Sequence, residues 1–314
     1  MRRTAAEPTT EPIKSAADKG LTPNMVENME PEKGAPAPKR IGVVAPARRI
    51  TEVLAETVDA AVKKAFAGNL ASAPELVFHP QCFMSDGHFA GSDSEREAAF
   101  VEIANDPSID AVWFAKGGYG SCRLRDQAFA ALTATAATKT YLGYSDLGVV
   151  LARLYRMGIG RQAHGPMPGD IVRDGGEAAV ARAARWLALG EPAGLEASPR
   201  PSAPVAAFNI TVLAHLVGVR DAVDFTGHVV MLEDVGEYLY ALDRSFFTIL
   251  MSEAMRGAAG VMLGRISDVP ENDTPFAKTP EEIARYWCDR AGVPFLGAAD
   301  IGHDSDNKIV IFGR

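Results

Sequence analysis

The chain has 314 residues, 47% of them hydrophobic, and its 32 basic and 40 acidic side chains give a formal charge of −8. This length and apolar content are enough to bury a full core, with two domains as the default expectation. No dense Lys/Arg cluster with interleaved aromatic residues, no bilayer-length apolar run and no secretory signal is visible, so neither nucleic acid nor a membrane is expected as a partner.

Residues 1–39 differ in composition from the rest of the chain. They are rich in Ala, Pro, Glu, Thr and Lys and contain almost no large apolar residues. Such a segment cannot bury enough apolar surface to offset the loss of chain entropy on ordering. We therefore predict a disordered or loosely docked arm here.

From residue 40 to about 170, short apolar runs alternate with helical patterns. The expected strands cover 41–45, 76–78, 111–115 and a run ending at 143, and the expected helices follow Thr51 and cover 92–104, 122–132 and a stretch from 147. Repeated strand–helix units of this length predict a doubly wound parallel sheet with helices on both faces. Ligands of such sheets bind at the carboxyl ends of the strands.

A second domain is expected after a change in composition. We predict an N-terminal α/β domain over 40–170, a linker region over 171–200 and a C-terminal domain over 201–314. The linker region contains a helix over 177–189 and a stretch rich in Pro, Ser and Ala. The second half is expected to mix strands at 229–233, 259–264 and 308–312 with helices around 211–216, 240–255 and 280–290.

The segment 141–146, Tyr-Leu-Gly-Tyr-Ser-Asp, is the most informative motif of the chain. A short apolar strand ends at Gly143, and Ser145 lies on the turn before a helix that begins at Leu147. This pattern resembles a nucleophile elbow, in which a tight turn exposes a serine hydroxyl beside backbone N–H groups that can bind an oxyanion. Leu147 replaces the usual glycine of that elbow, and an ordinary turn or N-cap serine is the alternative interpretation.

A glycine-rich segment at 116–121, Lys-Gly-Gly-Tyr-Gly-Ser, follows one strand and precedes a helix. Such a turn can cradle a phosphate or lend a backbone N–H to an oxyanion hole. It matches neither the Walker A loop nor the GxGxxG pattern, so the support for nucleotide binding is weak. Ser121 is a rival nucleophile, although a helix cap is the better interpretation of it.

Two further residues complete a hypothetical triad, in which a carboxylate orients an imidazole. Glu233 ends an apolar strand, where a solvated strand end or a helix cap is the alternative; Glu237 is the competing carboxylate, interpreted as a supporting or structural residue. His303 precedes a polar loop, and His164 is the rival base, with a structural role favoured. The order Ser145, Glu233, His303 is that of serine triads built on parallel sheets.

No cofactor is indicated by the sequence. The three cysteines, Cys82, Cys122 and Cys288, lack paired spacing, so neither a disulfide framework nor a zinc site is expected. No His/Asp/Glu set has metal-ligand spacing either, and metal-assisted hydrolysis is not favoured. Free thiols and the lack of an export signal suit the reducing cytoplasm.

Several segments together resemble one family, the LD-carboxypeptidases (muramoyltetrapeptide carboxypeptidases). The similarity covers about residues 40–314, and the ordered set of motifs is more specific than any one of them. The matching segments are 89–93 with 95–96, 116–120, 143–146, 164–167, 232–237 with 243–244, and 302–303. The resemblance implies that Ser145 is the nucleophile, that Glu233 orients the histidine and that His303 is the base.

The resemblance also implies a reaction and an assembly. The backbone N–H groups of Gly118 and Asp146 would hold the oxyanion, while Lys116 and Asn209 would contact the substrate. The chain would form a homodimer, and a smaller second domain of a swivelling β/β/α type would supply the glutamate and histidine across a cleft. Acyl transfer without a metal would release the terminal D-alanine of a cytoplasmic murein tetrapeptide in cell-wall recycling.

Three departures from the family pattern leave the substrate open. Lys116 replaces the usual arginine, residues 207–209 read Ala-Phe-Asn where Gly-Gly-Asn is usual, and the chain ends early, so a terminal strand is expected to be missing. Phe208 is expected near the substrate wall. The runner-up is a peptidyl-nucleotide amide hydrolase like the microcin C immunity peptidases, with Phe208 stacking on a nucleobase or simply packing. A catalytically weak peptide-binding homologue is the third hypothesis.

Overall fold

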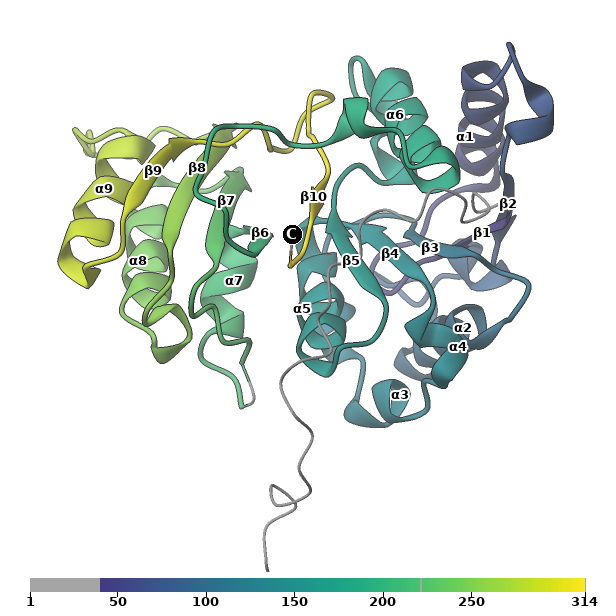
Figure 1. Ribbon diagram of the computed structural model, residues 1–314, viewed down its shortest axis with the longest axis horizontal. Coiled ribbons are helices and arrows are strands. Elements are labelled where there is room, and N and C mark those ends of the chain that lie inside the picture. The colour runs from purple at the N-terminus through teal and green to yellow at the C-terminus, as the bar shows by residue number, and fades with distance from the viewer. Residues whose placement is uncertain (1–39, 221, 314) are drawn as a thin grey trace, which may run out of the picture. The chain divides into compact units, whose positions relative to one another are not determined.

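The structure is a computed structural model that describes residues 40–220 and 222–313; the predicted arm, residues 1–39, lies outside the described residues. Two sheets organise the described chain (Figure 1). One has six strands in the order β10-β5-β4-β3-β1-β2, and the other has four in the order β6-β7-β8-β9. Within the described ranges, no helix combines the length and apolarity that crossing a membrane requires.

The six-stranded sheet is parallel except at one edge. Its strands are β1 (Arg40–Val44), β2 (Glu75–Phe78), β3 (Ala111–Phe114), β4 (Thr140–Gly143), β5 (Arg161–His164) and β10 (Val310–Ile311). The helices connected to it are α1 (Glu52–Ala65), α2 (Asp93–Asn105), α3 (Asp126–Ala130), α4 (Ala134–Ala137), α5 (Gly148–Met157) and α6 (Gly176–Leu189). β1 to β5 pair in parallel, whereas β10 runs antiparallel to β5.

Helices cover both faces of this sheet because its strands alternate between two apolar cores. Ile41 and Val43 pack into a cluster with α1 and α6, whereas Val44 packs into a cluster with α2 and α5. α2 begins at the predicted capping box, where the Ser92 side chain accepts from the N–H of Glu95 and the Glu95 side chain reaches back to the N–H of Ser92. The predicted doubly wound sheet is confirmed.

The smaller sheet is wholly parallel. Its strands are β6 (Val205–Asn209), β7 (Val229–Val235), β8 (Gly260–Ser267) and β9 (Phe295–Ala298). The helices between its strands are α7 (Ile210–Leu216), α8 (Leu239–Leu250) and α9 (Pro280–Ala291). This arrangement confirms the expected second, smaller α/β unit, although the sequence analysis did not identify β6 or β9.

Three predicted elements differ in the structure. The helix expected around 240–255 ends at Leu250, and Glu253–Met255 is a separate 3-10 turn. The helix expected over 122–132 is broken, because Arg125 is extended and donates its backbone N–H to the carboxylate of Glu97, so that α3 begins only at Asp126. The strand expected over 308–312 in the second half crosses to the first sheet as β10, which lies beside β5 in Figure 1. Beyond it, the ring of Phe312 packs against those of Phe208 and Tyr155.

The domain boundaries remain a prediction. α6 lies in the predicted linker region 171–200 but packs against α1 and the first sheet. β10 comes from the predicted C-terminal domain, yet it pairs with β5 of the first. We propose that the N-terminal domain extends through α6 and that β10 completes its sheet.

Candidate active site

A cleft of about 530 Å³ opens where several parallel strands of both sheets end. Lys116 follows β3 and Ser145 follows β4, while Asn209 ends β6 and Glu237 follows β7. His303, from the loop after β9, completes the lining of the cleft. This is the sheet edge at which the sequence predicted a site.

Ser145 occupies a strained turn. It opens a 3-10 turn, Ser145–Leu147, between β4 and α5, and its φ of 59° lies in the left-handed region. A non-glycine residue rarely adopts that conformation, and such strain is concentrated at functional sites. Gly117 approaches so closely that a Cβ there would lie 3.0 Å from the Ser145 Oγ. The turn therefore has the strand–turn–helix form of a nucleophile elbow.

The structure brings Ser145, His303 and Glu233 into one hydrogen-bonded chain. The His303 Nε2 lies 3.0 Å from the Ser145 Oγ, and the His303 Nδ1 hydrogen-bonds the Glu233 carboxylate. An ionised carboxylate can only accept, so Nδ1 carries the proton and Nε2 accepts from the serine hydroxyl. Glu233 is fully buried, whereas Ser145 is half-buried and reaches the cleft.

The electrostatics of this pair favour a basic imidazole. Burial alone would lower the pKa of His303, but the Glu233 carboxylate outweighs burial and leaves that pKa raised above 6.5. Burial raises the pKa of Glu233 as well, with His303 acting in the opposite direction. The second carboxylate oxygen, Oε1, is buried and has no hydrogen-bond partner among the described residues, so the His303 contact is this side chain's principal stabilising interaction.

Tyr144 supports the imidazole from one side. Its ring centroid lies 4.8 Å from that of His303, and its hydroxyl donates to Asp170 Oδ1 at 2.7 Å. Asp170 also accepts from the backbone N–H of Met167 and from the Arg173 guanidinium. The sequence analysis did not single out Tyr144, Asp170 or Arg173. Their positions could have indicated them, because Tyr144 precedes Ser145 and the other two follow β5.

The predicted oxyanion donors lie on two segments that are tied together. Gly118, with φ of 112°, and Asp146 both line the cleft next to Ser145. The Asp146 carboxylate accepts the backbone N–H of Ser121 at 2.8 Å, and the Ser121 hydroxyl donates to the Asp146 carbonyl. Ser121, the rival nucleophile, is fully buried in this contact, which fixes the glycine-rich loop against the Ser145 turn.

The two predicted substrate contacts have different surroundings. Lys116 lines the cleft half-buried, and it forms no hydrogen bond or salt bridge with any described residue. Burial, followed by the nearby Arg48 guanidinium, lowers the pKa of Lys116. Asn209 also lines the cleft, but its side chain caps α7 and donates to Asp234. Arg48 is a cleft residue that the sequence analysis missed, although it follows the end of β1.

Two other candidates take no place among the residues that line the cleft. Phe208 is not on the substrate wall as expected: it is fully buried and packs against Phe225 and Phe312, where its Cδ1 also faces Gly148. His164, the rival base, is buried beneath Tyr144, and burial lowers its pKa to about 3. Both are therefore core residues.

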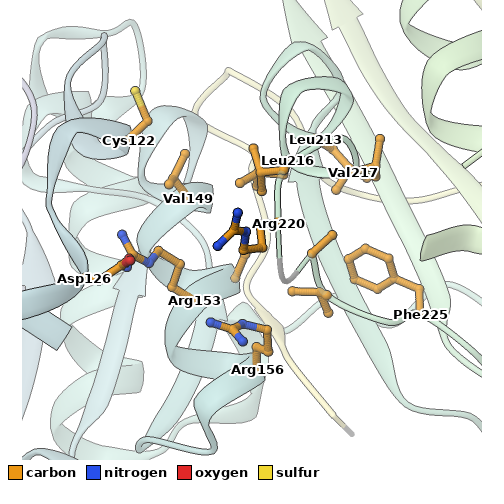
Figure 2. Close-up of a pocket in the computed structure, with 14 residues that line it drawn as sticks. Cys122, Asp126, Val149, Arg153, Arg156, Leu213, Leu216, Val217, Arg220 and Phe225 are labelled. Atoms are coloured by element: carbon orange, nitrogen blue, oxygen red, sulfur yellow. The ribbon is translucent and has the colours of Figure 1, made fainter. Parts of the chain in front are cut away.

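A second cavity, of about 320 Å³, lies away from Ser145 between α5 and α7. Figure 2 shows Leu213, Leu216 and Val217 facing Arg153 and Arg156 across it. It contains none of the predicted site residues. The Arg153 guanidinium already donates to the Leu124 carbonyl and pairs with Asp126, so this cavity has no evident part in the chemistry at Ser145.

In the part of the chain that the structure describes, no group of three or more His, Cys, Asp or Glu side chains is placed to hold a metal ion.

Two family models match the chain, and curated relatives cover most of it. Residues 41–165 match the family described as the LD-carboxypeptidase N-terminal domain, and residues 202–314 match the LD-carboxypeptidase C-terminal domain. A putative carboxypeptidase of Streptomyces coelicolor is 29% identical over 304 residues, covering 92% of this chain and 93% of that protein. A murein tetrapeptide carboxypeptidase of Pseudomonas aeruginosa is 26% identical over 242 residues, covering 72% and 78%.

Solved structures share the fold at lower identity. The muramoyltetrapeptide carboxypeptidase from Oxalobacter formigenes matches with a TM-score of 0.71 at 21% identity, covering 87% of this chain and 93% of that one. MccF in complex with glutamyl sulfamoyl guanosine matches with a TM-score of 0.67 at 17% identity, covering 89% and 98%. At these identities the matches establish the architecture.

Proposed function

Because the chain belongs to the LD-carboxypeptidase family, we propose that it is a serine peptidase that releases the terminal D-alanine of a murein tetrapeptide. The observation that carries this proposal is the hydrogen-bonded chain from Ser145 through His303 to Glu233. A hydroxyl is a weak nucleophile on its own, and an adjacent base held by a third group activates it.

The reaction proceeds through an acyl-enzyme. The Ser145 Oγ attacks the carbonyl carbon before the terminal residue while His303 Nε2 takes its proton, and the backbone N–H groups of Gly118 and Asp146 hold the oxyanion. The amine of D-alanine leaves with the proton from His303. Water, deprotonated by the same imidazole, then releases the shortened peptide. Each oxyanion donor contributes about a hundredfold or more in rate.

A carboxypeptidase must also recognise a free terminal carboxylate next to the scissile bond. Lys116 has no ion-pair partner among the described residues and lies near the Arg48 guanidinium, so two like charges face the cleft beside Ser145. An anion between them relieves their repulsion. We assign these side chains to the substrate carboxylate, with Asn209 as a further contact from β6.

The direct test is release of free D-alanine from a disaccharide-free murein tetrapeptide. We expect release from the D-alanine peptide and at least about a hundredfold slower release from peptides that end in L-alanine or in a D-alanine amide. Turnover of the amide at the rate of the free acid would contradict the carboxylate assignment. No release from any of the three peptides would contradict the proposed reaction.

The pH profile is a prediction of its own. The imidazole must be neutral to accept the Ser145 proton, so kcat/KM falls as the pH drops through the pKa of His303. Because Glu233 raises that pKa above 6.5, the midpoint of the acid limb is expected above pH 6.5. Steady-state kinetics from about pH 5 to 9 measure it. A midpoint at or below 6.5 would contradict the arrangement of charges.

The remaining proposals rest on the family resemblance. They are action in the cytoplasm during cell-wall recycling and assembly as a homodimer. The second candidate, amide hydrolysis of an aminoacyl nucleotide, takes its support from the MccF neighbour, whose structure holds glutamyl sulfamoyl guanosine. Phe208 gives that candidate no support, because it is buried in the core. The third hypothesis, a peptide-binding homologue, predicts affinity without turnover.

A further inference from the structure

His303 has to reach a serine that belongs to the other sheet. Ser145 follows β4 of the first sheet, whereas His303 lies in the segment 301–308, which joins β9 of the smaller sheet to β10. This segment, termed the His303 loop, is neither helix nor strand. The 3.0 Å contact between His303 Nε2 and Ser145 Oγ therefore depends on how the loop is attached to each sheet.

Hydrogen bonds inside the His303 loop join its two halves. The side chain of Asn307, which is fully buried, accepts the backbone N–H of Gly302 at 3.2 Å. The Asp304 carboxylate accepts the backbone N–H of Asp306 at 2.9 Å. Such a network makes the loop one unit. A displacement of the half that follows His303 therefore displaces the imidazole as well.

Arg265 of β8 attaches the His303 loop to the smaller sheet. Its backbone N–H donates to the Ile301 carbonyl at 2.8 Å, and its Nη1 donates to Asp300 at 2.6 Å. Its Nε and Nη2 both donate to the Asp304 carboxylate. A guanidinium that holds a carboxylate with two hydrogen bonds fixes its orientation as well as its distance. The loop is thereby fixed to the sheet that also carries Glu233.

Arg182 attaches the same loop to the first sheet. It belongs to α6, which packs against α1 and the first sheet, and its Nη2 donates to the carbonyls of Ser305 at 2.5 Å and of Asn307 at 2.9 Å. In Figure 1 the yellow segment between β9 and β10 reaches the side of α6. Gly175, just before α6, also lies close to the loop, since a Cβ there would lie 2.7 Å from the Ser305 Oγ.

We propose that Arg182 is a positioning residue for the reaction, which docks the His303 loop on the first sheet and so aligns the His303 Nε2 with the Ser145 Oγ. This step depends on the proposed function, because it assigns Arg182 an effect on that reaction. A misplacement of about 1 Å between reacting groups costs on the order of a hundredfold in rate. Arg182 does not line the cleft, so its effect is expected on kcat rather than on substrate affinity.

The test is Arg182→Gln, which removes both guanidinium hydrogen bonds to the loop. We expect kcat for D-alanine release to fall about a hundredfold, while KM stays within about threefold of the parental value. The rate at which a fluorophosphonate probe labels Ser145 should fall by a similar factor, because that reaction needs the same imidazole but no peptide.

Arg185→Gln is the matched control. Arg185 lies three residues further along α6 and is likewise half-buried, but it donates to the Glu191 carboxylate and to the Ala65 carbonyl instead of the loop. Arg185→Gln should therefore keep the parental kcat. Equal losses of kcat in the two variants would make Arg182 a structural residue of α6 and overturn the proposal, as would a parental kcat in Arg182→Gln.

If Arg182→Gln does not fold, Arg182→Lys and Arg185→Lys replace the pair. An ammonium on the shorter lysine stem cannot hold both loop carbonyls at the parental distances, so kcat should fall about tenfold in Arg182→Lys alone. Equal kcat values in these two variants would overturn the proposal.

If the parent releases no D-alanine from any peptide, the proposed function fails instead, and hydrogen exchange decides the role of Arg182. Faster exchange of the backbone amides of 302–307 in the Arg182 variant than in its Arg185 counterpart supports the docking of the His303 loop. Equal exchange in the two variants refutes it.

Discussion

Ser145→Ala is expected to lower kcat/KM for D-alanine release by about 10⁴-fold or more. The substitution removes the only cleft oxygen that His303 Nε2 contacts among the described residues, so no acyl-enzyme forms. Substrate binding should persist, because Lys116, Arg48 and Asn209 are untouched. A coupled assay for free D-alanine measures the rate, and calorimetry measures the affinity for the uncleaved tetrapeptide.

Ser121→Ala is the matched control, because Ser121 is the nearby serine that the sequence left as a rival. Its hydroxyl is buried against the Asp146 carbonyl, so its loss should cost less than about tenfold in kcat/KM through a looser oxyanion hole. A fluorophosphonate probe should label the parent and Ser121→Ala, but not Ser145→Ala. Activity of Ser145→Ala within tenfold of the parent would show that the nucleophile lies elsewhere.

The strained turn adds a measurement that does not depend on activity. Ser145 has a φ of 59°, a conformation that glycine adopts without penalty. Ser145→Gly should therefore have a free energy of unfolding about 1 kcal/mol larger than Ser145→Ala, in spite of glycine's greater chain entropy. Chemical denaturation of the two inactive proteins measures this difference. Equal stability would mean that the turn stores no strain at this residue.

The sequence was sufficient where local signals carried the information. Alternating strand and helix patterns predicted the doubly wound sheet, and Ser92 marked the start of α2 by its capping box. The site residues came from motifs at strand ends, a position that parallel sheets use for ligands. Their convergence could not be derived locally, because Ser145 and His303 are 158 residues apart in the chain and meet only when both sheets have formed.

The predictions that were wrong concern features that long-range packing determines. β10 has the composition of any short apolar strand, and only its pairing with β5 assigns it to the first sheet. Phe208 follows an alanine at the end of an apolar strand, and nothing local shows that its ring faces Phe225 and Phe312 rather than the cleft. Arg48 was likewise visible as a loop residue, but not as part of the cleft beside Ser145.

Glu233→Gln tests the carboxylate that hydrogen-bonds His303. It is expected to lower kcat/KM by about 10⁴-fold. The carboxylate accepts the proton of His303 Nδ1, which leaves Nε2 free to take the Ser145 proton. A carboxamide can instead donate to Nδ1 and hold the imidazole in the opposite tautomer, with a hydrogen on Nε2 facing the serine. The lost negative charge also lowers the pKa of His303, so residual activity should show its acid limb at lower pH than the parent.

The free energy of unfolding of Glu233→Gln is not expected to fall with its activity. Burial raises the pKa of Glu233 and leaves its Oε1 without a partner among the described residues, so the ionised carboxylate is poorly solvated in the fold. A neutral amide relieves that penalty, and the free energy of unfolding of Glu233→Gln should be no smaller than that of the parent. Chemical denaturation at neutral pH measures it.

Glu97→Gln supplies the contrast, because Glu97 is a buried carboxylate of α2 that does not line the cleft. The Arg125 guanidinium holds its pKa below the usual range through charged hydrogen bonds, and the amide loses them. We expect Glu97→Gln to lose about 1–3 kcal/mol of unfolding free energy while kcat/KM stays near the parental value. If Glu233→Gln instead lost stability and kept its activity, it would behave like Glu97→Gln. Glu233 would then be a structural carboxylate with no part in the mechanism.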